Sequence, residues 1–361
     1  MEKVRIGIIG VGGITQYAHI PCFQKLENVE IMAISDPNED KLKKVAEKFN
    51  IPQKFSDYQE LLAVKEIDAV VICTPNVFHK EQSVAALQSG KHVLCEKPVA
   101  LNSKETGEIL KTAKERGKKF MVAFCHRFDN TTQILKKYIE QGEFGEIYYA
   151  KATYLRRRGI PGLGGWFTIK KLSGGGPLID CGVHMLDTAI WLMGSPKPVE
   201  VVGSSYNKFK KEATDGGWPP VESRTGDKYS GTFDVEDLAT SFIKFANGAT
   251  LFLEASWAGN SETGLFLSLF GTKAGAKVGQ SEEEGKMGGR GLKIFTEKQG
   301  GLVDILPVLP EVNPYQKEAE HFVECIRENK EPITKPEEIL NVVKIIEAIY
   351  LSAEKGEEVK L

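Results

Sequence analysis

Three ionisable side chains follow a glycine run in the middle of the chain. Asp180, His184 and Asp187 come shortly after Gly174-Gly175-Gly176. In a helix, spacings of four and three residues place the three side chains on one face. A carboxylate beside an imidazole can orient a general base, and Gly182 leaves room beside them for a flat group. The structural alternatives are an N-cap role for Asp180 and a hydrogen-bonded core position for His184.

The composition is that of an ordinary globular protein, and the length suggests two domains or one large one. The chain has 361 residues, of which 41% are hydrophobic and 27% charged, and its formal net charge is −2. With a net charge so close to zero, the protein has no overall electrostatic attraction to nucleic acid or to a membrane surface. The six cysteines include no C-x-x-C pair, which favours reduced thiols in a cytoplasm over disulfides or a zinc site. We see no signal peptide and no apolar run long enough to span a bilayer.

A metal site at the helix of Asp180, His184 and Asp187 is not expected. No cysteine or second histidine completes a convincing ligand set with these three side chains. The sequence therefore favours an enzyme without a bound metal.

The first third of the chain alternates short apolar runs with helical stretches. The runs 4–9, 29–35, 68–73, 92–95 and 119–124 are typical of strands buried on both faces of a parallel sheet. The stretches 40–49, 58–64, 78–88 and 103–116 are typical of the intervening helices. This pattern predicts a doubly wound parallel sheet, which binds ligands at the carboxyl ends of its strands.

A glycine turn joins the first strand to the first helix. Gly10 permits a tight turn, and Gly12 lets the backbone approach a pyrophosphate beside the helix N-terminus. Thr15 stands where a third small residue is usual, so the motif is incomplete.

Asp36 ends the second strand and lies 24 residues after Gly12, near the spacing expected for an acid that binds the adenosine ribose. The alternative is a helix N-cap. A carboxylate at this position repels a 2′-phosphate, which favours NAD over NADP, and nearby Lys41 softens that preference.

Two further strand ends carry polar groups. Thr74-Pro75-Asn76 follows the strand 68–73, and Glu96-Lys97-Pro98 follows the strand 92–95. Pro98 disfavours the α region for Lys97, so we expect an extended lysine at the sheet edge. The alternative is a solvated surface lysine.

The second half of the chain has a different pattern. Strands are predicted at 146–158, 199–204, 238–246, 249–257, 264–270, 292–296 and 302–305, and helices at 131–140, 179–193, 315–329 and 337–355. Strands that follow one another directly indicate a mostly antiparallel sheet. The glycine-rich loop 159–176 carries Trp166, whose indole can stack on a sugar or a nicotinamide. The polar stretch 208–234 is predicted to be a lid or an assembly arm.

Four motifs in order resemble the glucose–fructose oxidoreductase/inositol dehydrogenase (Gfo/Idh/MocA) family. They are residues 10–14, 74–79, 90–98 and 175–184. The resemblance implies a Rossmann domain, here 1–126, that binds NAD(P). It also implies an α+β domain, here 127–361, with a large, mainly antiparallel open sheet for substrate binding and oligomerisation. Members are often homodimers or homotetramers.

The resemblance also implies roles for individual residues. Lys97, Asp180 and His184 resemble the catalytic set, and Arg127 and Asp187 resemble substrate contacts. The implied cofactor contacts are Gly10, Gly12, Gly13, Ile14, Asp36, Thr74, Pro75, Asn76, His79, Glu96, Lys97 and Trp166. Among these, Glu96 resembles the acid that binds the nicotinamide ribose.

These residues lead to the hypothesis of an NAD-dependent dehydrogenase acting on a cyclic polyol, sugar or glycoside. His184 takes the hydroxyl proton, Asp180 orients the imidazole, and Lys97 stabilises developing negative charge. One alternative is a glycoside hydrolase that oxidises its substrate transiently with NAD. The other is a non-catalytic dinucleotide sensor, which would be expected to lack this catalytic set.

Overall fold

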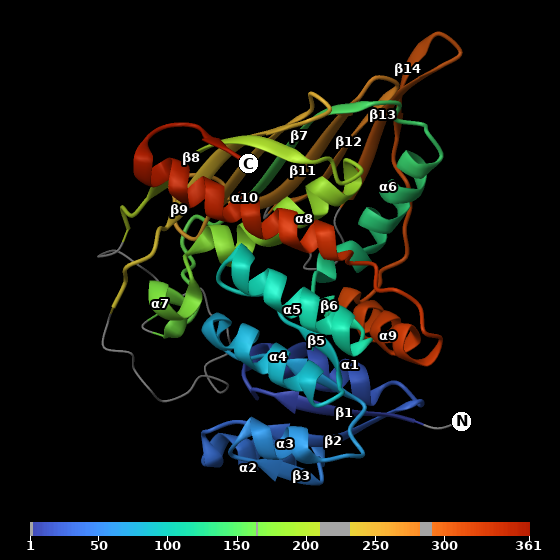
Figure 1. Ribbon diagram of the computed structural model, residues 1–361. Helices are drawn as coiled ribbons and strands as arrows, with labels where there is room; N and C mark the ends of the chain where they lie inside the picture. Colours follow the sequence, from blue (N-terminus) through green and yellow to red (C-terminus); the bar gives the residue numbers. More distant parts are fainter. Residues whose placement is uncertain (1–2, 164, 210–231, 282–290) are drawn as a thin grey trace.

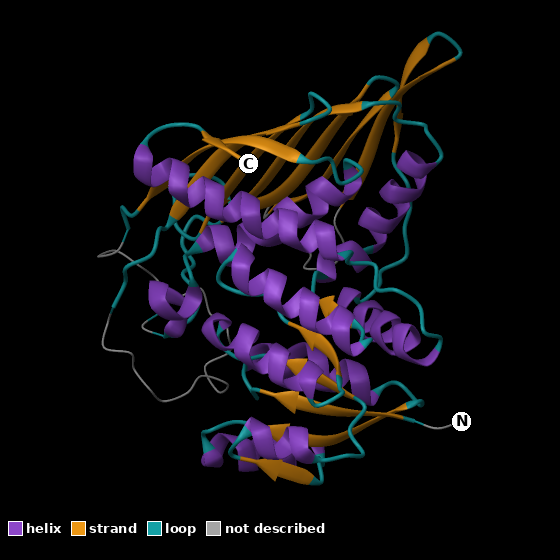
Figure 2. Cartoon of the chain, viewed as in Figure 1, coloured by secondary structure: helices purple, strands orange, loops and turns teal. Residues whose placement is uncertain are grey.

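Two β-sheets form the frame of the molecule, with helices packed between and around them (Figures 1 and 2). The computed structural model describes residues 3–163, 165–209, 232–281 and 291–361. One sheet has six strands in the order β3-β2-β1-β4-β5-β6. The other has nine strands in the order β14-β13-β12-β11-β7-β10-β9-β8-β15. The predicted fold class is confirmed.

All strand pairs of the six-stranded sheet are parallel. Its strands are β1 (Val4–Ile9), β2 (Val29–Ser35), β3 (Gln53–Phe55), β4 (Ala69–Ile72), β5 (His92–Cys95) and β6 (Phe120–Val122). The helices that cover it are η1 (Thr15–His19), α1 (Ile20–Gln24), α2 (Glu39–Phe49), α3 (Tyr58–Ala63), α4 (His79–Gln88) and α5 (Ser103–Arg116). The central strands are buried on both faces, as their unbroken apolar runs require.

The nine-stranded sheet is mainly antiparallel. Its strands are β7 (Ile147–Leu155), β8 (Pro198–Tyr206), β9 (Leu238–Phe245), β10 (Thr250–Ser256), β11 (Gly264–Gly271), β12 (Ala274–Ser281), β13 (Gly291–Lys298), β14 (Gly301–Ile305) and β15 (Val359–Lys360). Among the described strand pairs, β7 and β10 alone run parallel. Leu251, Leu253 and Ala255 of β10 point to the buried face, while its other side chains alternate outward.

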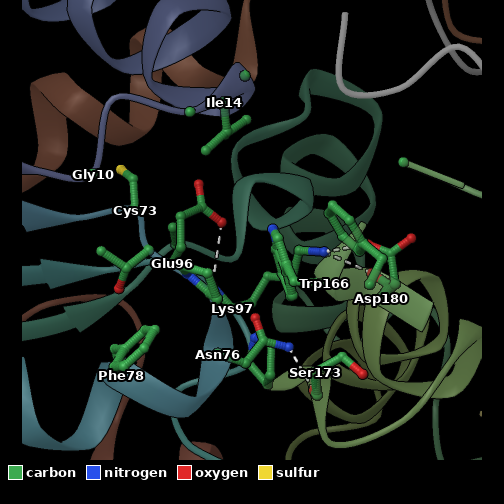
Figure 3. A pocket seen from close by; sticks show the side chains of 18 of the residues that line it. Gly10, Ile14, Cys73, Asn76, Phe78, Glu96, Lys97, Trp166, Ser173 and Asp180 are labelled. Carbon is green, nitrogen blue, oxygen red and sulfur yellow. Dashed lines mark hydrogen bonds and ion pairs between the residues drawn. The ribbon is translucent and has the colours of Figure 1, made fainter. Parts of the chain in front are cut away.

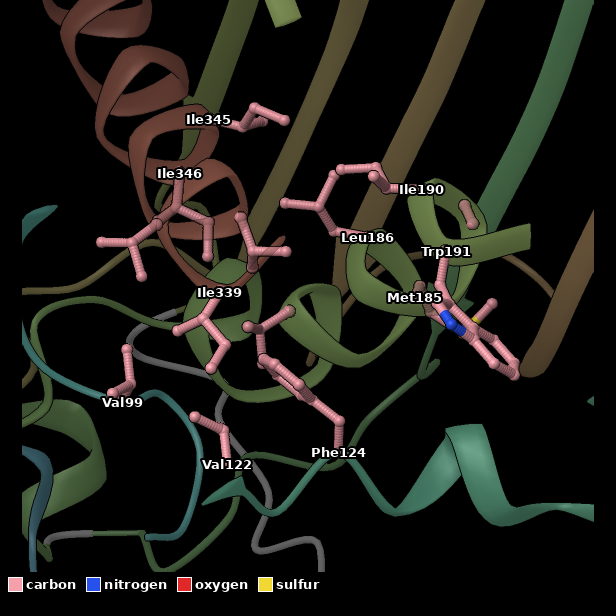
Figure 4. Close-up of a cluster of buried hydrophobic side chains, with 14 of the residues drawn as sticks. Val99, Val122, Phe124, Met185, Leu186, Ile190, Trp191, Ile339, Ile345 and Ile346 are labelled. Atoms are coloured by element: carbon pink, nitrogen blue, oxygen red, sulfur yellow. The ribbon is translucent and has the colours of Figure 1, made fainter. Parts of the chain in front are cut away.

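The longer helices of the second half pack against the two sheets. They are α6 (Asn130–Glu140), α8 (Val183–Leu192), α9 (Pro314–Arg327) and α10 (Pro336–Lys355). Val99, Val122 and Phe124, from the parallel-sheet side, share one hydrophobic cluster with Leu186 of α8 and Ile346 of α10 (Figure 4). Because this core joins the two layers, the loop after β5 and the start of α8 are held in a fixed relation.

One late helix returns to the first layer. Ala319 and Phe322 of α9 pack in the same cluster as Ile20 and Phe23 of α1. The C-terminal half therefore contributes to the core of the parallel sheet, and the division at 126/127 stays a prediction.

The predicted stretch 208–234 lies mostly outside the described residues. Within the described ranges, the helices are too short or too polar to cross a lipid bilayer.

Candidate active site

A cavity of about 1600 Å³ lies between the carboxyl edge of the parallel sheet and the start of α8. The predicted site residues that line it are Gly10, Gly12, Gly13, Ile14, Asp36, Thr74, Pro75, Asn76, Glu96, Lys97, Trp166, Asp180 and His184. His79, Arg127 and Asp187 are not among its lining residues. Figure 3 shows part of this wall, with Lys97 and Asp180 facing each other across it.

The glycine turn after β1 forms one end of the cavity. Gly10 has a φ of +89°, and a Cβ there would lie 2.7 Å from the carbonyl oxygen of Cys73. A Cβ at Gly12 would meet nothing nearer than 4.0 Å, which leaves the backbone open to a ligand. Thr15 is accommodated because its buried hydroxyl donates to the Gly10 carbonyl over 2.7 Å. The turn has the open backbone that a pyrophosphate needs.

Asp36 is fixed at the same end. Its Oδ2 accepts from the backbone N–H of Val11 and its Oδ1 from that of Asn38, each over 3.0 Å. The N-cap of α2 is Asn38, whose side chain accepts from Lys41 N–H, so the capping alternative for Asp36 is wrong. Lys41 Nζ lies 3.9 Å from Asp36 Oδ2. Burial lowers the pKa of Lys41 although Asp36 opposes this.

Glu96 lies deeper, at the end of β5. Its Oε1 is 2.7 Å from Nε2 of His19, which is 3% exposed. Burial disfavours the carboxylate, but the hydrogen bond and charge of His19 outweigh it and hold the pKa of Glu96 below its usual value. Its Oε2 accepts from the backbone N–H of Lys97 over 3.2 Å, so both oxygens are held in place. Each carboxylate oxygen has a further lone pair that can accept from a ribose hydroxyl.

The neighbouring loops are tied together by two buried side chains. His79 bridges the carbonyls of Pro98 and Thr74, at 2.7 and 2.9 Å, and so holds the Glu96-Lys97-Pro98 loop from behind. Asn76 Nδ2 donates to the carbonyl of Ser173 over 2.7 Å, linking this edge to the glycine-rich loop of the second half. His79 therefore supports the site from outside the cavity.

Lys97 and Asp180 meet across the cavity. Lys97 Nζ lies 2.9 Å from Asp180 Oδ1 and 2.7 Å from the Asp180 carbonyl. Burial disfavours the charged form of each side chain, but the attraction between the ammonium and the carboxylate outweighs this effect. The carboxylate of Glu96 further stabilises the ammonium of Lys97. The pKa of Lys97 is raised and that of Asp180 lies well below its usual range. Lys97 is therefore a cationic hydrogen-bond donor at neutral pH.

The rest of the Asp180 environment comes from its neighbour Cys181 and from residues that directly follow β7 and β10, which the sequence did not connect with it. Trp257 Nε1 donates to Asp180 Oδ2 over 3.0 Å, and Cys181 Sγ lies 3.4 Å from the same oxygen. Arg156, whose guanidinium lies 3.3 Å from the hydroxyl of Tyr154, adds positive charge near Asp180. Both oxygens of Asp180 thus accept from groups other than the imidazole, and its orienting role toward His184 stays a prediction.

The expected gap beside Gly182 is filled. Residues Leu178–Gly182 form a π-helical turn before α8, and a Cβ at Gly182 would lie 3.1 Å from the Cβ of Ala255. The prediction of room for a flat group was wrong, since the missing side chain lets this turn pack against β10.

His184, on the first turn of α8, also lines the cavity. Its ring stacks on that of His126, with centroids 4.5 Å apart and an interplanar angle of 27°. Trp166 stacks on Phe167 at 4.0 Å and lies at the cavity wall (Figure 3). The imidazole, the ammonium of Lys97 and the indole thus border one space.

Arg127 and Asp187 occupy a buried ion network. Arg127 is 1% exposed and donates to both oxygens of Asp187, at 2.9 and 2.7 Å, and to Glu338 at 2.6 Å. This network ties η3 (Cys125–Phe128) to α8 and α10 behind the cavity. Its position favours a structural role over substrate contact.

Comparisons with known proteins agree with this architecture. The sequence model described as "Oxidoreductase family, NAD-binding Rossmann fold" matches residues 4–124, and its partner, "Oxidoreductase family, C-terminal alpha/beta domain", matches residues 136–361. Among curated relatives, a D-glucoside 3-dehydrogenase of Escherichia coli K12 is 33% identical, covering 100% of this chain and 98% of the relative. A scyllo-inositol 2-dehydrogenase (NAD(+)) of Bacillus subtilis 168 is 28% identical, covering 92% and 89%.

Among solved structures, levoglucosan dehydrogenase in complex with NADH and L-sorbose matches with a TM-score of 0.85 at 24% identity. The match covers 100% of this chain and 99% of that one. At this identity the likeness shows the shared fold. With both family models matched over nearly the whole length, the chain belongs to the Gfo/Idh/MocA family of oxidoreductases.

Proposed function

We propose that this protein is an NAD(P)-dependent dehydrogenase that oxidises a secondary alcohol on the ring of a sugar, glycoside or cyclic polyol. The observation that carries the proposal is the convergence of Lys97, Asp180 and His184 on one cavity with the glycine turn and Asp36. The sheet edge offers the open backbone and the carboxylates that a dinucleotide requires. When bound, the nicotinamide supplies the hydride acceptor.

The side chains of the protein transfer the proton and stabilise the negative charge that develops on the substrate oxygen. His184 accepts the hydroxyl proton, and the ammonium of Lys97 donates to the same oxygen as negative charge develops on it. The ion pair with Asp180 fixes the ammonium in place before substrate enters. In the reductive direction the same groups protonate the oxygen.

Glucosides are the substrate class that we favour. The D-glucoside 3-dehydrogenase of Escherichia coli K12, 33% identical over the whole of this chain, is named for oxidation of D-glucosides at C3. A pyranoside presents several hydroxyls and an apolar ring face, which suit Arg156 and Trp166 at the cavity wall.

A spectrophotometric screen tests this function. Formation of NADH from NAD is followed at saturating cofactor with alkyl glucosides, free aldoses, inositols and an anhydro-sugar. We expect NADH formation with at least one glucoside. Release of nitrophenol from a nitrophenyl glycoside without net NADH would instead assign the transient-oxidation hydrolase.

We further propose that NAD is preferred over NADP, because the fixed carboxylate of Asp36 repels a 2′-phosphate. Asp36→Ala is expected to weaken NAD binding about tenfold or more, the loss of a hydrogen bond to a charged group. NADP binding should strengthen or stay unchanged, since Lys41 remains beside the site. The measurement is a fluorescence titration with each reduced cofactor, and Asp40→Ala, on the exposed face of α2, is the matched control. Equal weakening of both cofactors would contradict ribose recognition.

A homo-oligomer formed through the outer face of the nine-stranded sheet is also proposed. Phe242, Phe270 and Phe295 are 51%, 39% and 41% exposed on outward positions of β9, β11 and β13. Aromatic side chains clustered on an exposed sheet face are typical of a protein interface. Phe242→Glu is expected to weaken self-association by about 2 kcal/mol or more. Light scattering after size-exclusion chromatography measures this, with Leu351→Glu as control, and an unchanged mass for Phe242→Glu would contradict it.

A cytoplasmic location is proposed from the cysteines. All six are free thiols and all are buried, as reduced cysteines in a reducing compartment often are.

A further inference from the structure

A cysteine and a second histidine lie beside His184. Cys125 and His126 begin η3, directly after the strand end at the parallel sheet, and His184 begins α8. One ligand atom from each of the three residues lies within 4.8 Å of the other two. Local sequence patterns do not connect them, because α6 and β7 lie between the two segments along the chain. The premise that no cysteine or second histidine accompanies His184 does not hold in the folded chain.

We propose that Cys125, His126 and His184 bind a soft divalent transition metal such as Zn²⁺, and that this metal inhibits the enzyme. One thiolate and two imidazoles are a ligand set that suits zinc. All three residues line the cavity, so an ion can enter from it, and a fourth ligand such as water can reach the ion by the same route. Three protein ligands with one open position are the arrangement of exchangeable rather than closed zinc sites.

The three ligand atoms have to move closer together before they can hold a zinc ion. Zinc bonds of about 2.0–2.3 Å require ligand atoms closer together than 4.8 Å. The two imidazoles are stacked, with an interplanar angle of 27°, so their in-plane nitrogen lone pairs lie in nearly parallel planes. One ring therefore has to turn before both nitrogens can bind the same ion. We therefore expect binding that is weaker than in structural zinc sites and reversible by a chelator.

A neighbouring residue supports the thiol. Tyr315, which also lines the cavity, hydrogen-bonds with Cys125. Such an outer contact orients a ligand toward the ion. Binding deprotonates the Cys125 thiol, and the proton is released to solvent.

We expect inhibition because the metal binds His184, the proposed general base. The nitrogen lone pair of His184 that accepts the substrate proton is the one that the ion occupies. This part rests on the proposed dehydrogenase function, whereas metal binding itself does not.

Cobalt spectroscopy tests the binding independently of activity. Metal-free protein is titrated with Co²⁺, and the thiolate-to-cobalt charge-transfer band and the visible bands of tetrahedral cobalt are recorded. We expect one Co²⁺ per chain for the wild type. The thiolate band should be lost in Cys125→Ser, and affinity should fall at least about tenfold in His126→Gln.

Cys325→Ser is the matched control. Cys325 Sγ also lies beside a histidine, 3.4 Å from His321 Nε2, but the pair lies on α9 outside the cavity lining. This variant should keep the wild-type cobalt spectrum. No thiolate band in the wild type, a band that persists in Cys125→Ser, or one that disappears in Cys325→Ser would overturn the site.

A second experiment measures how strongly Zn²⁺ inhibits the dehydrogenase reaction. Each protein is compared with its own metal-free rate. The wild type should lose most of its rate at equimolar Zn²⁺ and regain it with a chelator, while Cys125→Ser should need at least about tenfold more Zn²⁺. Cobalt binding without inhibition would keep the site and overturn the inhibitory role. If no substrate is found, the spectra alone still decide the site.

Discussion

Replacing Lys97 with alanine is expected to lower kcat for alcohol oxidation by about 10²- to 10³-fold, the effect of removing one preorganised donor from a developing oxyanion. Lys97 Nζ is held 2.9 Å from Asp180 Oδ1, and the pKa of Lys97 is raised because Asp180 and Glu96 outweigh the effect of burial. The ammonium is therefore charged and aimed before the reaction begins. Initial rates of NADH formation on the substrate found in the screen give the measurement.

The control is the binding of NADH, followed by fluorescence. Because Lys97→Ala leaves the glycine turn, Asp36 and Glu96 unchanged, the dissociation constant of NADH should change by less than about threefold, an effect of under 1 kcal/mol, although the family resemblance also implies a cofactor contact for Lys97. Lys97→Arg restores the positive charge in a different shape and should recover little of the rate. A kcat for Lys97→Ala within a few-fold of the wild type would contradict the assignment of this lysine.

Replacing Arg127 with alanine is expected to destabilise the protein by about 3–5 kcal/mol, because two buried carboxylates lose their shared cation. Asp187 is 1% exposed and Glu338 is 5% exposed, and both accept from Arg127. Burial already raises the pKa of Asp187 although Arg127 opposes this, so loss of the guanidinium drives the carboxyl further toward its neutral form. Urea unfolding followed by fluorescence gives the free energy of unfolding.

The matched control is Lys80→Ala on the surface. Lys80 pairs with Glu108 at 2.8 Å, but both side chains are exposed, so its loss should cost less than about 1 kcal/mol. If Arg127→Ala instead folds with wild-type stability and only raises the KM for the sugar, the substrate role implied by the family resemblance is right and the structural role is wrong.

Much of the fold follows from local patterns in the sequence. The strands β1, β2 and β5 match the largely apolar runs 4–9, 29–35 and 92–95, because a strand that is mostly buried on both faces is built mainly from apolar residues. β3 was missed because its three residues are half-exposed at the sheet edge. β12 was missed because Ala274–Ser281 is rich in small residues and glycines, which carry little strand propensity.

The site was predictable only where its residues are close in sequence or end a strand. The strand-end position of Lys97 and the glycine-rich approach to Asp180 both indicated the cavity. The donors from Trp257 and the charge of Arg156 depend on the register of β7 and β10, which local patterns do not give. The same holds for the stacking of His126 on His184, which unites segments that meet only when the two layers pack.

The most direct test of the proposed chemistry is transfer of a labelled hydrogen. A glucoside that gives NADH in the screen is prepared with deuterium on each carbinol carbon in turn and incubated with the wild type and NAD. Mass spectrometry of the reduced cofactor should show one deuterium, from one ring position, and the His184→Gln variant should form it at least about 10²-fold more slowly. Turnover of the sugar that leaves the cofactor without deuterium for every labelled position would contradict hydride transfer at this site.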